Sequence, residues 1–144
     1  MISGVSDDYD LRTDLADMDL DRIHTWLSTD AYWALGRSRE AVGTAAEHSL
    51  NLGAFTRDGH QVAYARVVTD HANFAWLCDV YVDRDHRGRG LAKRLVAAVV
   101  ARLDDLGVRR TLLATRDAHG VYAGFGFEEL PDPGIWMVRT PHPG

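Results

Sequence analysis

The stretch VYVDRDHRGRGLAKRL, residues 80–95, joins an apolar run to a helix-like segment through two glycines and several cationic residues. The run that leads into it, residues 73–82, is almost entirely apolar, which predicts a strand buried on both faces. Beyond the glycines, apolar residues recur at every fourth position from Leu91 to Leu103 and predict a helix that ends at Gly107. A strand that passes this directly into a helix is typical of a β-α-β unit.

The turn between them, residues 87–90, reads Arg-Gly-Arg-Gly. The first N–H groups of a helix lack intrahelical partners, and the helix dipole attracts anions to that end. Glycines let several N–H groups converge and let a ligand approach closely. The turn therefore predicts a site for a phosphate or pyrophosphate, with a tight turn that merely requires glycine as the structural alternative. The P-loop pattern is absent, and Lys93 stands where a dinucleotide-binding fingerprint needs its third glycine or alanine.

The remaining segments place this unit in one sheet with flanking helices. Asp58-Gly59 predicts a hairpin turn. Ser38 is a candidate helix N-cap, and Ala41, Ala45 and Leu50 fit on one face of the helix that follows. The fold class is α/β (α+β), with a central mixed, mostly antiparallel sheet. The expected elements are a strand at 9–14, helices at 19–28 and 38–50, a hairpin at 51–70, strands at 73–82, 109–115 and 135–140, a long helix from residue 91 and a short helix within 117–127.

Composition limits the classes of function. The chain has 144 residues, which predicts a single domain over 1–144, and its net charge of -5 disfavours nucleic acid as a partner. Cys78 is the only cysteine, so neither an intrachain disulfide nor a cysteine-based zinc site can form, and we expect no metal. No signal peptide or membrane span is visible, so we expect a cytoplasmic protein that binds no membrane. The sequence leaves a homodimer open.

Two motifs resemble the GCN5-related N-acetyltransferases (GNAT family). RGRGLA, from Arg87 to Ala92, matches the family's R/Q-x-x-G-x-G/A motif, which opens a helix directly after a central strand. AHGVYAGFGF is similar to the later A-x-x-x-Y-x-x-x-G-F pattern, with Tyr122 at the tyrosine and Gly126-Phe127 at the end. The order of the expected elements agrees over nearly the whole chain, including the final strands.

The resemblance implies acetyl-coenzyme A as the donor and a small-molecule or peptide amine as the acceptor. The backbone of Val80, Tyr81 and Val82 would pair with the pantetheine arm as an added strand. Tyr122 would protonate the departing thiolate. The pyrophosphate would be bound at the motif, which comprises Arg87, Gly88, Arg89, Gly90, Leu91, Ala92 and Lys93.

The general base is less well defined by the sequence. Asp79 is the first candidate, because a carboxylate in an apolar strand is costly to bury unless it has a function or a partner. The alternative is that Asp79 is a structural acid at a strand bulge. His119 and water are the next candidates. Thr115 stands where many family members have an asparagine that contacts the cofactor. Cys78 is expected to pack as a small hydrophobic side chain.

Aromatic residues cluster between the first two predicted helices. Trp26, Tyr32 and Trp33 could line an acceptor site and attract an amine by cation–π interaction, or could simply pack the helices onto the sheet. The function expected from the resemblance is acetyl transfer to a primary amine by direct attack in a ternary complex. The alternative is an acyl-coenzyme A-binding sensor or interaction module without turnover.

Overall fold

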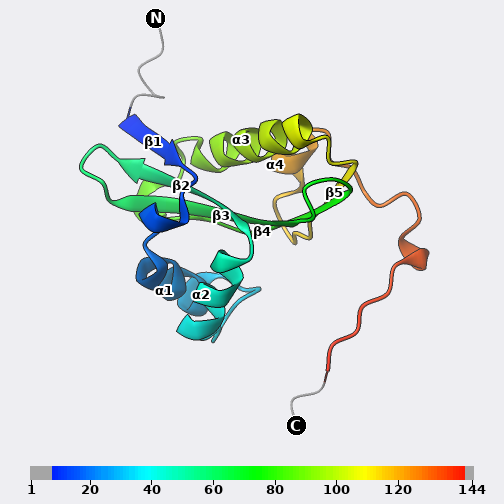
Figure 1. Ribbon diagram of the computed structural model, residues 1–144, viewed down its shortest axis with the longest axis horizontal. Coiled ribbons are helices and arrows are strands. Elements are labelled where there is room, and N and C mark those ends of the chain that lie inside the picture. Colours follow the sequence, from blue (N-terminus) through cyan, green and yellow to red (C-terminus); the bar gives the residue numbers. More distant parts are fainter. Residues whose placement is uncertain (1–7, 142–144) are drawn as a thin grey trace, which may run out of the picture.

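The computed structural model describes residues 8–141. Its centre is a five-stranded sheet in the order β1-β2-β3-β4-β5, in which the first four strands are antiparallel and β4 pairs in parallel with β5 (Figure 1). This arrangement confirms the mixed, mostly antiparallel sheet expected from the sequence. The strands are β1 (Tyr9–Arg12), β2 (Leu50–Thr56), β3 (Gln61–Thr69), β4 (Phe74–Val82) and β5 (Arg110–Leu112).

Helices cover both faces of the sheet. Figure 1 shows α1 and α2 on one side and α3 and α4 on the other. No helix of the described residues is long and apolar enough to cross a membrane. The helices are α1 (Leu20–Asp30), α2 (Arg39–Glu47), α3 (Leu91–Leu106) and α4 (His119–Ala123), with short 3-10 turns η2 (Leu15–Asp17), η3 (Arg84–His86) and η4 (Pro133–Ile135).

Local signals in the sequence fix several helix ends. The Asp19 side chain accepts a hydrogen bond from the Arg22 N–H at 3.0 Å and caps α1. Ser38 Oγ accepts from the Ala41 N–H at 3.1 Å and caps α2, as predicted. Gly107 ends α3 in the left-handed region at φ 74°, which also confirms the prediction.

Two clusters of buried side chains form the core, one on each face of the sheet. Leu95 and Val99 of α3 pack with Leu77 of β4 on one face. Ile23 of α1 packs with Tyr64 of β3 on the other. The long helix α3 therefore contacts the sheet through the apolar face that its periodicity predicted.

Two burial predictions were wrong. Residues of β4 alternate between buried and open positions instead of being buried on both faces, and Phe74 and Trp76 are each 36 % exposed. The helices on that face reach only the end of β4 that contains Tyr81, so the first half of the strand stays uncovered. In α2 the buried residues are Val42 and Ala46, one position away from the predicted face.

The C-terminal part also departs from expectation. The strand predicted at 109–115 contains only the three residues of β5, which are partly exposed. The strand predicted at 135–140 is not formed within residues 8–141, and this segment leads away from the body (Figure 1). A strand needs a partner as well as a suitable sequence, and the chain's own β5 is not paired with it.

Candidate functional site

The first feature of the candidate site is an open edge of β4. β4 and β5 pair only from Phe74↔Arg110 to Trp76↔Leu112, whereas β4 continues to Val82. In the described part of the chain, residues 77–82 therefore have a strand partner on one side only, which is β3. Unpaired N–H and C=O groups along an edge can bind an extended ligand through main-chain hydrogen bonds.

This edge leads to the glycine-arginine turn. Gly88 and Gly90 have φ of 79° and 77°, a region that glycine adopts without strain. A Cβ added at either glycine would meet no heavy atom within 4 Å, so both face open space. Gly90 is the N-cap of α3 and no side chain caps the helix there. The first N–H groups of α3 are thus left for an anionic ligand, and the turn fits a phosphate group.

The arginines of the turn make contacts within the protein. Arg87 Nε donates to the Val82 carbonyl oxygen at 2.9 Å, and Arg87 Nη2 lies 3.3 Å from Asp30 Oδ2. Arg84 also hydrogen-bonds to Asp30. Arg89 Nη1 donates to Tyr9 Oη at 3.0 Å. The backbone N–H groups, rather than unpaired guanidinium groups, are therefore the main feature available to an anion.

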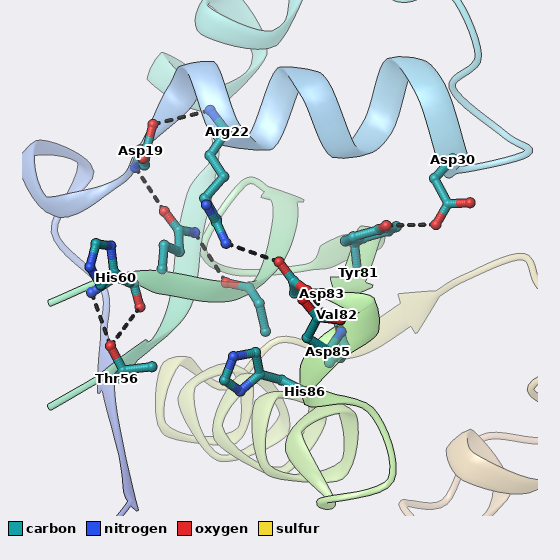
Figure 2. A network of polar contacts seen from close by, with 12 residues as sticks. Asp19, Arg22, Asp30, Thr56, His60, Tyr81, Val82, Asp83, Asp85 and His86 are labelled. Carbon is teal, nitrogen blue, oxygen red and sulfur yellow. Dashed lines mark hydrogen bonds and ion pairs between the residues drawn. The ribbon is translucent and has the colours of Figure 1, made fainter. Parts of the chain in front are cut away.

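Asp30, at the end of α1, connects the turn to the helix layer. Tyr81 Oη donates to Asp30 Oδ2 at 2.6 Å, and Arg22 Nη2 donates to Asp83 Oδ2 at 3.0 Å (Figure 2). The Arg84 guanidinium and the Tyr81 hydroxyl hold the pKa of Asp30 well below its usual range. Both ends of α1 are thereby attached to the end of β4 and the start of the turn. This role of Asp30 has no signal in the sequence, because the residue lies among many other aspartates.

Asp79 lies at an irregularity in β4. Its φ is 53°, and the register between β3 and β4 shifts at this point, between Tyr64 and Arg66. The carboxylate is buried and accepts hydrogen bonds from Trp33 Nε1 at 2.9 Å, Arg37 Nη1 at 2.8 Å and Arg66 Nε at 2.8 Å.

These contacts decide the charge of Asp79. Burial by itself would raise the pKa of Asp79, but the charges and hydrogen bonds of Arg66 and Arg37 outweigh burial and lower that pKa. An ionised carboxylate held by three donors is a weak base at neutral pH. The arrangement favours the structural alternative that the sequence left open. Arg66, a cation within an otherwise apolar strand, was the signal in the sequence that could have identified the pair.

Two of the three predicted acceptor-site aromatics lie together at the surface. Tyr32 and Trp33 are 39 % and 42 % exposed, and their rings meet edge to face with centroids 5.0 Å apart. Tyr32 Oη accepts a hydrogen bond from the Arg116 N–H at 3.0 Å, so the loop after α1 contacts the loop after β5. Trp26 is buried instead, stacked on Tyr81 at 5.4 Å, which favours its packing role.

Tyr122 lies in α4 close to this aromatic pair. Its ring meets Phe127 edge to face at 5.9 Å. Burial raises the pKa of the Tyr122 phenol, and the neighbouring Tyr32 and Asp117 raise it further. The phenol is therefore protonated at neutral pH and able to donate its proton. His119, at the start of α4, is exposed.

Cys78 precedes Asp79 in β4. It is partly buried, and burial raises the pKa of its thiol to about 11. The thiol is thus protonated at neutral pH, in agreement with the expectation that it packs as a small hydrophobic side chain. Among residues 8–141, no group of three or more His, Cys, Asp or Glu side chains is arranged to hold a metal ion.

Comparisons with known proteins point to one family. The model of the acetyltransferase (GNAT) family matches residues 20–127. A candidate acetyltransferase of the GNAT family from Xanthomonas campestris pv. campestris superposes with a TM-score of 0.88 at 46% identity, covering 92% of this chain and 93% of that one.

More distant proteins agree with this match. A candidate acetyltransferase of Gibberella zeae is 27% identical over 129 residues, which are 76% of this chain and 73% of that protein. The fold is also that of a candidate acetyltransferase from Clostridium acetobutylicum crystallised with acetyl-CoA, with a TM-score of 0.70 at 14% identity, covering 92% and 96% of the two chains.

Proposed function

Because this chain belongs to the acetyltransferase (GNAT) family, we propose that it transfers an acetyl group from acetyl-CoA to a primary amine by direct attack in a ternary complex. The observation that carries the proposal is the open edge of β4, which leads to the uncapped start of α3. Tyr122 packs on the core cluster that contains Leu77 of β4, and Tyr32 contacts the loop after β5 through the Arg116 N–H.

The donor would be held mainly by backbone groups. The N–H groups of residues 88–93 would bind the pyrophosphate, since the turn is open and α3 is uncapped there. The edge at Val80–Val82 would pair with the amides of the pantetheine arm. A ligand amide at Val82 would share the carbonyl oxygen with Arg87, which a carbonyl with two lone pairs permits.

Tyr122 is the proposed general acid. When the amine attacks the thioester carbonyl carbon, the bond from carbon to sulfur breaks and the sulfur leaves with the electron pair. The Tyr122 phenol, protonated at neutral pH, would give its proton to that sulfur. Tyr122 packs on the same core cluster as Leu77, Val80 and Val82 of β4, which supports this role.

The attacking amine must first lose a proton. Asp79, His119 and water are the three candidates for the base. The three donors on Asp79 make it the weakest base of the three. We therefore propose that water or the exposed His119 removes the proton from the amine. The same donors give Asp79 a positioning role, because it holds Trp33 and Arg37 beside the proposed acceptor site.

The acceptor is proposed to lie against Tyr32 and Trp33. Two partly exposed aromatic rings offer apolar contact and cation–π attraction to an ammonium group. The sequence also left open a cofactor sensor without turnover. The similarity to acetyltransferases along more than nine-tenths of the chain favours the enzyme.

The proposal is tested with a panel of amines that differ in size and charge, incubated with the protein and acetyl-CoA. Release of free coenzyme A thiol is recorded, and product mass identifies the acetylated amine. We expect thiol release that depends on one class of primary amine. Thermal stabilisation by acetyl-CoA without thiol release from any amine would support the sensor instead.

A further inference from the structure

The uncovered part of β4 and the adjoining end of β3 form an apolar patch on one face of the sheet. Val68 pairs with Trp76 across the two strands, so both side chains lie on that face, as does Phe74 two residues before Trp76. Tyr64, farther along β3 on the same face, packs with Ile23 of α1. Val68, Phe74 and Trp76 are 42 %, 36 % and 36 % exposed. Large apolar side chains that stay open side by side indicate a surface that binds a ligand.

The apolar patch adjoins the ion cluster around Asp79. Arg66 stands two residues before Val68 in β3 and lies on the same face of the sheet. Arg66 Nε donates to Asp79 Oδ2 at 2.8 Å, and Trp33 Nε1 donates to Asp79 Oδ1 at 2.9 Å. Trp33 and Tyr32 are the two rings of the proposed acceptor site. The apolar patch, the ion cluster and the aromatic pair therefore border one another.

The ion cluster carries more positive than negative charge. Arg37 Nη1 and Arg66 Nε each lie 2.8 Å from Asp79 Oδ2. Among residues 8–141, Asp79 is the one carboxylate that forms an ion pair with either guanidinium. Two cations and one anion leave one positive charge in excess. Arg116, with its guanidinium 4.6 Å from the centroid of the Tyr32 ring, adds another charge, which the adjacent Asp117 offsets.

Arg37 is the member of the cluster that a ligand can reach most directly. Its side chain is 25 % exposed, against 14 % for Arg66 and 2 % for Asp79. Within the described part of the chain, Arg37 donates through Nη1 alone, and none of its nitrogens is both buried and without a partner. Nε and Nη2 of Arg37 are therefore open to a further acceptor. A guanidinium binds a carboxylate through two parallel hydrogen bonds, so an organic acid is the ligand that suits this group best.

We propose that the acceptor is an amino acid with an apolar side chain, and that its carboxylate binds Arg37 while its side chain lies on the apolar patch. The inference rests on the proposed acetyl transfer and names the class of its acceptor. The carboxylate balances the excess charge, and the patch buries the side chain. Trp76 is the last residue of β4 that pairs with β5, so the amine is held where the two strands separate. A diamine or polyamine would instead add positive charge to a site that already has an excess.

Matched acceptors test the carboxylate. Leucine, methionine, phenylalanine and tryptophan are each compared with the corresponding amide, which keeps the amine and the side chain but lacks the charge. Release of thiol from acetyl-CoA gives kcat/KM for each compound. We expect at least one of the acids to exceed its amide by about 10- to 100-fold, the range for a hydrogen bond to a charged group. Amides that react as well as the acids, or a preference for amines without a carboxylate, would overturn the proposal and leave the acetyl transfer standing.

A pair of variants separates a contact with the acceptor from a structural role of Arg37. Arg37→Gln should raise KM for the preferred acid about tenfold or more and leave kcat/KM for its amide within about twofold of wild type. A role only in holding Asp79, or at the thioester oxygen, would affect acid and amide alike, and that result would contradict the proposal. Arg39→Gln makes the same change at an exposed arginine of α2 that pairs with Asp21, and it should match wild type with both compounds.

Calorimetry measures the binding site without turnover. The same acids and amides are titrated into protein saturated with coenzyme A, which has no acetyl group to give. We expect an acid to bind more tightly than its amide, and this preference to be lost in Arg37→Gln and kept in Arg39→Gln. Such a result supports the carboxylate site even where no amine releases thiol, the outcome that contradicts the acetyl transfer. If none of the acids either binds or is acetylated, the proposed acceptor class is wrong.

Discussion

The Trp33 indole N–H donates a 2.9 Å hydrogen bond to Asp79 Oδ1, joining the loop after α1 to the irregularity in β4. The ring of Trp33 is partly exposed, whereas the carboxylate is buried between Arg37 and Arg66. A wall of the proposed acceptor site is therefore positioned by a buried ion cluster. This link makes stability and acceptor binding depend on the same carboxylate.

Replacing Asp79 should affect stability more than it affects the chemistry. Asp79→Asn keeps the shape and suits the positive φ, but leaves two partly buried guanidinium groups without their anion. We expect a loss of about 3 kcal/mol in the free energy of unfolding. Turnover of the folded variant should keep the pH profile of the wild type. If the variant loses the rise in turnover with pH that reports deprotonation of the base, Asp79 is the base.

The stability difference should itself depend on pH. The pKa of Asp79 is lower in the folded protein than its ordinary value of 3.8. The stabilisation is therefore fully present above that ordinary value and is lost as the pH falls through the folded-state pKa. Urea unfolding of wild type and Asp79→Asn at a series of pH values should show a difference that is greatest near neutrality and shrinks below about pH 4. A difference that does not change with pH would contradict the ion cluster.

The glycine turn offers a matched pair of variants. Asn and Asp both tolerate the positive φ of Gly90 and have nearly the same shape, so they differ in charge alone. We expect Gly90→Asp to lose affinity for coenzyme A far more than Gly90→Asn, because the carboxylate would repel the pyrophosphate. Calorimetric titration measures the affinity of both variants for coenzyme A. Equal affinities would show that the pyrophosphate binds elsewhere.

Tyr122→Phe tests the general acid. The variant keeps the ring against Phe127 and removes only the phenolic proton. Turnover should fall by about 10²-fold, at the lower end for a positioned acid, because a thiolate is already a fair leaving group. Affinity for coenzyme A should stay within twofold of wild type, since that contact comes from the turn. A folded variant with unchanged turnover would remove Tyr122 from the mechanism.

Local features were predictable from the sequence and long-range partners were not. The strand-turn-helix of β4 and α3, the cap at Ser38 and the end at Gly107 follow from periodicity and from single residues with strong preferences. The partners of Asp79 come from segments 42 and 13 residues away, and no periodicity connects them. Residues 135–140 have the composition of a strand, but whether a strand forms depends on a partner that the local sequence does not specify.

Direct transfer in a ternary complex is the central claim, and intact-protein mass spectrometry tests it most directly. Burial keeps the Cys78 thiol protonated, so the single cysteine of the chain is a poor acceptor of the acetyl group. With acetyl-CoA alone, the protein should keep its unmodified mass and release no thiol; when the amine is added, thiol and acetylated amine should appear in equal amounts. An acetylated protein formed before any amine is present would contradict the account.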